Sequence, residues 1–174
     1  AALSFLKHYA DGRAADAPYE RLQHLRDFRS ATESLLLSHD YIEGLYLFAE
    51  NGAAFSNTKG SELALGYSPF ADDWYRSTLD RQGQMHVGDM ERQPFLLTDK
   101  PSITFSRALY DPKTKRRIGV LLINCGANLF DELRAGILAD QRIEVLSGSG
   151  RKLFESEASA EPSFVPAEAE GSRV

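Results

Sequence analysis

SHDYIEGLYLFAENGAAFSN, residues 38–57, is the stretch that decides the fold. Residues 41–50 are mostly aromatic or aliphatic and alternate little, which is typical of a central strand buried on both faces. Asn51 and Gly52 follow, and this pair tolerates the positive φ angles of a tight hairpin turn. We therefore predict that residues 41–50 and 53–57 pair as antiparallel strands.

A long helix is predicted immediately before this hairpin, over residues 19–40. Pro18 suits the first turn of a helix, because its missing N–H has no partner there in any case. At helical spacing the segment carries an apolar stripe that would face the sheet. The stripe consists of Tyr19, Leu22, Leu25, Phe28, Thr32, Leu35 and Leu36.

Further strands are predicted downstream, at residues 102–111 and 118–127, with a weaker one at 84–91 after a short helix over 74–83. The basic run 113–117 reads as a solvated hairpin turn. Together the pattern predicts an α+β domain, a five-stranded antiparallel sheet with the long helix on one face. The loop-rich segment 58–102 would cover the other face and leave a hollow for a small molecule.

The chain divides near residue 140. Residues 1–140 contain the sheet and a closing helix over 129–140, so we assign them to one domain. Residues 141–157 read as a short hairpin, which is marginally stable alone. The end of the chain is rich in Ala, Glu, Pro and Ser. Residues 141–174 are therefore predicted to be the truncated start of a second subdomain or a flexible tail.

Composition excludes several kinds of protein. The net charge of −5 and the lack of a basic stripe argue against nucleic acid as a partner. The single cysteine, Cys125, permits no internal disulfide and no paired-thiol metal site. The four histidines lack metal-ligand spacing, so no metal or cofactor is expected. No apolar run is long enough to span a membrane and no methionine opens the chain, as expected of a fragment cut from a longer protein.

Three stretches resemble one family. Residues 38–57, DDWYRSTLDRQGQMHVG at 72–88 and SITFSRALYDPKTKRRIGVLLINCG at 102–126 resemble the membrane-distal PAS-like subdomain of double-Cache sensors. The resemblance covers roughly residues 17–140. It implies the extracytoplasmic, ligand-sensing part of a membrane-anchored bacterial sensor histidine kinase in the cell membrane. The fragment itself would not be an enzyme, and it could form a homodimer through the long helix.

The resemblance also implies site residues. Amino-acid-binding members use an Arg-x-Trp-Tyr element and an aspartate on the last strand. Trp74 and Tyr75 match, as pocket walls or as plugs of the core. Asp72 stands where the arginine would, and Asn124 where the aspartate would. An arginine clamps a carboxylate and Asp72 would repel one, so a cationic, polar neutral or sugar-like ligand is expected.

Four polar residues have two interpretations each. Asp72 and Asp89 flank the expected pocket, where they either act as acid–base groups or bind a cation, or are only solvated loop residues that form Asx turns. Arg107 shares a strand face with apolar residues and needs a partner, either a carboxylate such as Asp89 or Asp111 or the ligand. Asn124 lies in an apolar strand and must bond to backbone groups or to the ligand.

Other functions remain open at this point. A PAS-like interaction or dimerisation domain without a small-molecule ligand would have large apolar side chains filling the hollow beside Trp74. A chemoreceptor ligand-binding domain would share the fold and the pocket. A small hydrolase would need a nucleophile and a base within hydrogen-bond reach, which the sequence does not indicate.

Overall fold

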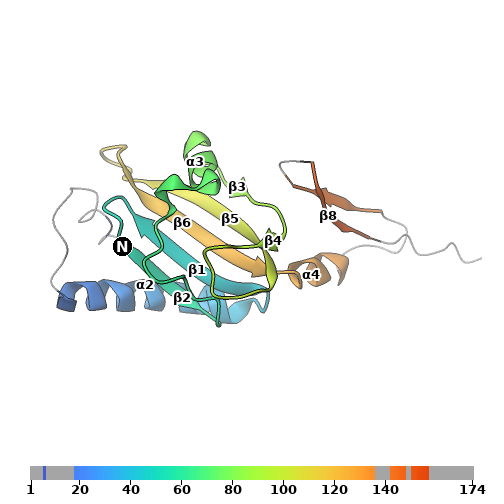
Figure 1. Ribbon diagram of the computed structural model, residues 1–174, viewed down its shortest axis with the longest axis horizontal. Helices are drawn as coiled ribbons and strands as arrows, with labels where there is room; N and C mark the ends of the chain where they lie inside the picture. Colours follow the sequence, from blue (N-terminus) through green and yellow to red (C-terminus); the bar gives the residue numbers. More distant parts are fainter. Residues whose placement is uncertain (1–5, 7–17, 136–141, 148–149, 157–174) are drawn as a thin grey trace, which may run out of the picture.

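An antiparallel sheet with a helix on one face and a loop-rich segment on the other forms the main body (Figure 1). The computed structural model describes residue 6 and residues 18–135, 142–147 and 150–156. The strands of the sheet follow the order β2-β1-β6-β5, and two short strands pair with the outer edge of β5. The bounds are β1 Ile42–Ala49, β2 Ala54–Thr58, β3 His86–Val87, β4 Glu91–Arg92, β5 Pro101–Tyr110 and β6 Arg117–Gly126.

This sheet confirms the predicted fold class, with one difference in the outermost strand. The predicted strand 84–91 is divided into β3 and β4, which pair with different parts of β5. Between them Gly88 donates its N–H to the carbonyl of Thr104 at 2.8 Å. A Cβ at this glycine would lie only 2.6 Å from Oγ1 of Thr104, so the close crossing requires glycine.

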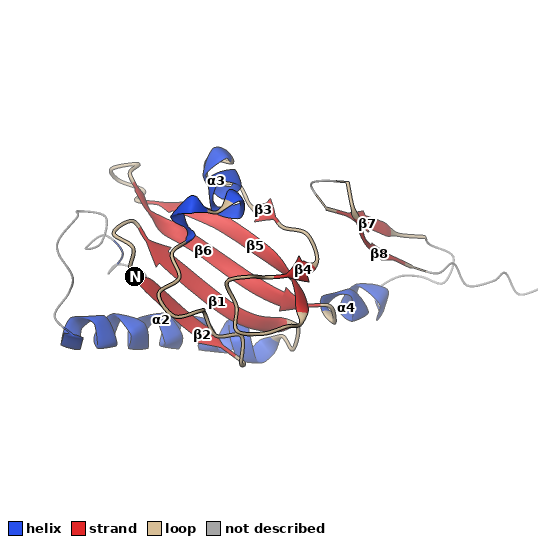
Figure 2. Ribbon diagram, viewed as in Figure 1, coloured by secondary structure: helices blue, strands red, loops and turns tan. Residues whose placement is uncertain are grey.

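The long helix α2, Pro18–Ser38, packs on β2 and β1 at one side of the sheet (Figure 2). Only Phe28 and Leu36 of the predicted stripe are buried, whereas Tyr19, Leu22 and Leu35 are exposed. The helix touches the sheet along two strands, so few of its positions reach the core. The prediction of the helix is confirmed and that of its continuous buried stripe is wrong.

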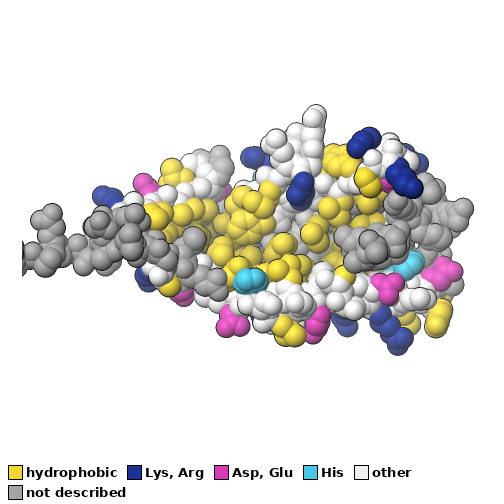
Figure 3. Space-filling view, turned by 180° about the vertical axis from the view of Figure 1, so that it is seen from behind, with side chains coloured by type: hydrophobic (Ala, Val, Ile, Leu, Met, Phe, Trp, Pro, Cys, Tyr) yellow, Lys and Arg dark blue, Asp and Glu magenta, His cyan; other side chains and the backbone are white. Residues whose placement is uncertain are grey.

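Side chains on the two faces of the sheet form separate cores. On the helix side, Leu6, Phe28 and Leu36 pack with residues of β1, β2 and β5. Phe105, Leu109, Leu121 and Ile123 lie on the same side and are only half-buried. Figure 3 shows hydrophobic side chains gathered along the middle of the molecule when it is seen from behind.

The opposite face of the sheet is mixed in polarity. Three rows cross β1, β6 and β5 on this face: Gly44, Asn124 and Thr104; Tyr46, Leu122 and Ser106; and Phe48, Val120 and Ala108. Above them lie the 3₁₀ turn η1, Pro69–Ala71, and the helix α3, Asp73–Asp80. The polar residues of these rows lie nearest α4, Leu129–Ala135, or in the middle of the sheet.

The end of the described chain forms a small hairpin. Strands β7, Glu144–Leu146, and β8, Lys152–Glu155, pair with each other and not with the main sheet. Phe154 stacks on Phe130 of α4 with ring centroids 5.3 Å apart. The hairpin is confirmed, while the assignment of residues 141–174 to a second subdomain or a tail stays a prediction. Residues 136–141 and 157–174 lie outside the described ranges.

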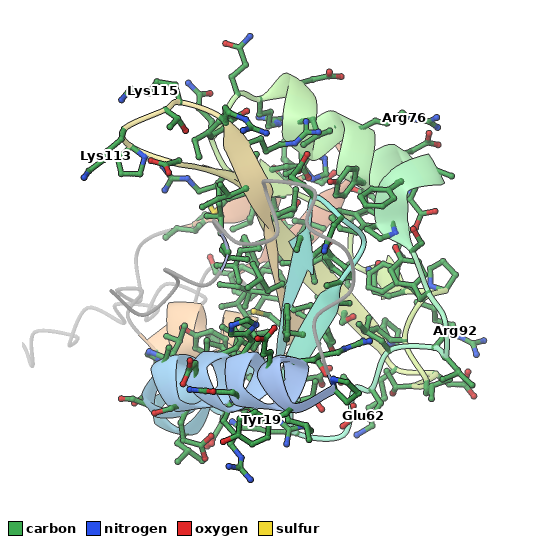
Figure 4. The ribbon with its side chains drawn as sticks, turned by 90° about the vertical axis from the view of Figure 1, so that its left-hand side faces the viewer. Tyr19, Glu62, Arg76, Arg92, Lys113 and Lys115 are labelled. Carbon is green, nitrogen blue, oxygen red and sulfur yellow. The ribbon has the colours of Figure 1, made fainter. Side chains whose placement is uncertain are left out.

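The basic run forms the turn between β5 and β6, as predicted. Figure 4 shows Lys113 and Lys115 at the tip of this turn, pointing away from the sheet. The same view places Tyr19 of α2 and Arg76 of α3 on opposite sides of the sheet. Within the described ranges, no helix has both the length and the hydropathy needed to cross a bilayer.

Candidate functional site

A cleft of about 890 Å³ opens on the face of the sheet opposite α2. Residues of η1 and α3, from Ala71 to Arg81, form one wall, and residues of the β3–β4 segment, from His86 to Pro94, form the other. Thr104 of β5 contributes to its floor. Clefts of this size are typical of sites for small organic molecules.

Asp72 holds the indole of Trp74 in place at the cleft wall. The indole Nε1 donates to Oδ2 of Asp72 at 3.2 Å and to the hydroxyl oxygen of Tyr67 at 3.0 Å. The hydroxyl of Tyr67 donates to the same carboxylate oxygen at 2.5 Å. Burial and this bond to Asp72 both raise the pKa of Tyr67. Tyr67 therefore keeps its hydroxyl hydrogen, and the carboxylate of Asp72 accepts hydrogen bonds from both Tyr67 and Trp74.

The inner side of Trp74 is filled with aromatic rings. Its ring centroid lies 5.8 Å from that of Phe48 and 5.8 Å from that of Phe95. Tyr67 stacks on Phe95 at 5.1 Å. A filled hollow beside Trp74 is the feature expected of an interaction domain without a ligand. Trp74 combines this feature with that of a ligand site, because its inner side packs on aromatic rings and its outer side lines the cleft.

The lining of the cleft is predominantly acidic. Five carboxylates and two guanidinium groups line it, which are Asp72, Asp73, Asp80, Asp89 and Glu91 against Arg76 and Arg81. Asp73 and Arg76 form an exposed ion pair, so they largely neutralise each other. The remaining excess of negative charge favours a cation over an anion. In the described parts of the chain, no three His, Cys, Asp or Glu side chains gather as metal ligands.

The sheet beneath the cleft holds polar atoms without partners. Asn124 is fully buried beside Thr104, and its Nδ2 donates to Oε2 of Glu43 at 3.2 Å. Among the described residues, Oδ1 of Asn124 and Oγ of Ser102 have no hydrogen-bond partner. A buried polar atom left unpaired costs about 1–3 kcal/mol.

The structure places three of the six predicted site residues in the cleft lining, and a fourth, Asn124, is buried next to a lining residue without reaching the cleft. Asp72, Trp74 and Asp89 line the cleft, and Asn124 lies on the same face of the sheet. Their role as ligand contacts remains a prediction. Asp89 also lies 3.9 Å from the guanidinium of Arg151.

Tyr75 and Arg107 do not line this cleft, and their predicted role as ligand contacts stays a prediction. Tyr75 is buried between α3 and the sheet against Ala108 and Val120, as the core plug that was its alternative interpretation. Arg107 extends from the other face of β5, and its Nε donates to the carbonyl of Gly83 at 2.6 Å. A backbone carbonyl therefore takes the place of the carboxylate expected as its partner.

Several residues of the site are absent from the sequence-based prediction. Tyr67 lies in the irregular segment 58–73, where no periodicity indicates which side chains point inward. Glu43 and Thr104 belong to predicted strands, and alternation alone places Thr104 on the face of Asn124. His86 lies in the cleft lining, whereas the sequence shows only that it lacks metal-ligand spacing to the other histidines.

The chain is similar to known proteins in structure but not in sequence. No family model matches the sequence, and no curated protein matches it. Solved structures do match. The isoleucine-bound sensory domain of the Campylobacter jejuni chemoreceptor Tlp3 superposes with a TM-score of 0.57 and 19% identity, over 87% of this chain and 60% of that one.

A second sensory domain gives a similar result. The ligand-binding domain of the Pseudomonas fluorescens chemoreceptor CtaA, in complex with L-isoleucine, has a TM-score of 0.53 and 14% identity over 74% of this chain. This chain has the fold of a chemoreceptor sensory domain. It spans about 60% of the Tlp3 sensory domain and 50% of the CtaA domain. The sensory-domain fold agrees with the PAS-like, Cache-type architecture expected from the sequence.

Proposed function

We propose that this chain is an extracytoplasmic ligand-sensing domain of a membrane-bound signal-transduction receptor. The observation that carries the proposal is the cleft beside Trp74, on the face of a sheet whose fold is that of chemoreceptor sensory domains. A sensory role requires a site for a small molecule, and the volume and the concave, partly aromatic lining of the cleft fit one.

The proposed ligand is a small polar cation. The acidic lining would attract it, and the face of Trp74 offers a surface for a cation–π contact. A free carboxylate would meet Asp72 and Asp89 in the same cleft, and like charges at short range repel.

Signalling would follow from a difference in ligand affinity between two arrangements of the cleft. The α3 wall and the β3–β4 wall lie on either side of the ligand, so binding favours the arrangement in which both walls touch it. The shift would reach α2 through the sheet. Asn57 of β2 already links the two, because its Nδ2 donates to Oγ1 of Thr32 at 3.0 Å.

The output of the parent receptor has two candidates. The resemblance of residues 38–57, 72–88 and 102–126 to double-Cache sensors supports a two-component sensor histidine kinase. The sensory domains of Tlp3 and CtaA belong to chemoreceptors, and this likeness favours a chemoreceptor as the second candidate. The sequence flanking this domain in the parent gene distinguishes them, since a kinase and a chemoreceptor carry different cytoplasmic modules.

A homodimer through α2 is part of the proposal. Tyr19, Leu22 and Leu37 of this helix are exposed, with relative exposures of 76%, 57% and 67%. A second copy would cover these apolar side chains. Sedimentation velocity tests this, and Leu22→Glu should shift the protein towards the monomer. A wild-type protein that remains monomeric at high concentration contradicts the dimer but not the ligand site.

A thermal-shift panel tests the ligand class. Putrescine, choline and L-arginine represent cations, L-glutamate and lactate represent anions, and L-isoleucine and L-serine represent zwitterions. A ligand that binds only the folded state raises the melting temperature. We expect a rise with at least one cation and none with the anions. A rise with the anions alone, or with no compound of the panel, would overturn the proposal of a cation-binding site.

A further inference from the structure

His86 lies where the α3 wall of the cleft meets the sheet. It pairs with Ser106 of β5 across the ladder. The hydroxyl of Ser106 lies 2.6 Å from that of Thr78 in α3, and both residues are almost completely buried. His86 is therefore the strand neighbour of a residue that makes one of the contacts between α3 and the sheet. It also lines the cleft.

The hydroxyl pair has a defined direction. Thr78 donates its only hydroxyl hydrogen to the carbonyl of Trp74 at 2.7 Å. Ser106 must therefore donate to Thr78, which leaves Ser106 with no hydrogen for another partner. The bond from Ser106 to Thr78 is therefore one link between β5 and α3 that a displacement of β3 at His86 would reach through the ladder.

A protonated imidazole does not suit this position. Nδ1 of His86 is buried and has no hydrogen-bond partner among the described residues. In the imidazolium form both ring nitrogens carry hydrogen, so protonation places an N–H at Nδ1. An unpaired buried donor costs free energy, whereas an arrangement that exposes Nδ1 to water avoids that cost.

Charged groups from both walls surround the imidazole. Burial lowers the pKa of His86, and the positive charge of Arg81, which follows α3, lowers it further. Asp89, which follows β3, has the opposite effect on this pKa but is the weaker influence. Asp80 and Glu91 line the same cleft, while β5 contributes the uncharged Ser106 and Thr104.

We propose that His86 makes the cleft proton-sensitive: the neutral imidazole keeps the α3 wall docked on β5, and its protonation favours an open cleft that holds cations less well. A group whose pKa is lowered in the closed arrangement stabilises that arrangement fully only above its ordinary pKa. For an imidazole this value is about 6.5. The stabilisation is lost as the pH falls below it.

Hydrogen exchange of the α3 amides tests this without any ligand. Exchange is measured at about pH 7.5 and about pH 5.5 and corrected for the intrinsic effect of pH. We expect α3 to exchange about tenfold faster at the lower pH in the wild type. This is the effect of one proton taken up by the open arrangement over about one pH unit below the ordinary pKa of imidazole. His86→Gln should remove the difference, and His24→Gln on α2 should retain it.

The outcomes separate this proposal from the proposed function. An equal change of exchange in wild type and His86→Gln overturns the proton-sensitive cleft. So does wild-type protection of α3 that is the same at both pH values. Should His86→Gln fail to fold, NMR titration of the wild-type imidazoles replaces it, and a pKa of His86 at or above about 6.5 overturns the proposal.

The affinity for putrescine provides a second measurement, and it rests on the proposed function. We expect the affinity to fall by about threefold to tenfold between the two pH values, and by less in His86→Gln. If putrescine does not bind at either pH while α3 exchange depends on His86, the proton-sensitive cleft stands and the cation-binding function loses support.

Discussion

Asp72 stands two positions before Trp74 and accepts the indole N–H of this tryptophan at 3.2 Å. One carboxylate therefore both contributes negative charge to the cleft and orients its largest aromatic wall. Tyr67 shares the same oxygen, so the orientation of Trp74 is held from two directions. The negative charge of the cleft and the orientation of Trp74 thus depend on the same side chain. A substitution of Asp72 that keeps the acceptor but removes the charge separates the two effects.

Asp72→Asn should weaken the binding of a cation while leaving the fold intact. The amide oxygen still accepts the indole N–H, but the negative charge is lost. We expect the affinity for a cation that stabilises the wild type to fall about tenfold, which corresponds to about 1.4 kcal/mol. Asp73→Asn is the matched control, because Asp73 is exposed and already paired with Arg76. Equal effects of the two substitutions in isothermal titration would contradict this assignment.

The hydroxyl pair between α3 and β5 should respond asymmetrically to substitution. In Thr78→Val, Ser106 keeps a buried hydroxyl without an acceptor, which should cost about 1–3 kcal/mol of the free energy of unfolding. In Ser106→Ala, Thr78 still donates to the carbonyl of Trp74, so the cost should be smaller. Urea denaturation measures both values. A larger loss in Ser106→Ala would show that the direction of the bond is reversed.

Phe28 should contribute far more to stability than its neighbours on α2. It is fully buried, and truncation of a buried phenylalanine costs about 3–5 kcal/mol. Leu22 belongs to the same sequence stripe but is 57% exposed in the single chain, so Leu22→Ala should change the free energy of unfolding of the monomer, measured in dilute protein, by no more than about 0.5 kcal/mol. Similar losses in Phe28→Ala and Leu22→Ala would mean that the helix packs along its whole stripe.

Cys125 should be unreactive in the folded protein. Its side chain is buried, and burial together with the nearby Glu43 raises the pKa of the thiol to about 12. Since the thiolate is the reactive form, labelling by a disulfide reagent near neutral pH should be at least about a hundredfold slower than in urea. Labelling at the same rate in both conditions would contradict the buried position.

The sheet was predictable because its strands carry strong local signals. Residues 41–57 combine apolar runs with the Asn51–Gly52 turn, and β5 alternates cleanly, so both pairings follow from the sequence. The contacts of α2 were not predictable in the same way. A stripe shows which residues can face a core, but the number that do depends on how much of the helix the sheet covers.

The site was predictable only where residues lie on regular elements or match a motif. Trp74, Asp72 and Asn124 were identified by resemblance, and the structure brings them to one face of the sheet. Tyr67 was missed, because its approach to Asp72 depends on the path of an irregular loop. Alternation gives the face of β5 on which Arg107 lies, but the sequence does not show that this face is the side away from the cleft.

Fluorescence of Trp74 tests the central claim most directly, because it is the only tryptophan of the chain and it lines the cleft. A cation that raises the melting temperature should change the intensity or wavelength of its emission in a saturable way, with the same dissociation constant as in calorimetry. Asp72→Asn should weaken both signals together. Stabilisation by the cation with no change in tryptophan emission would place binding elsewhere and contradict a ligand site in this cleft.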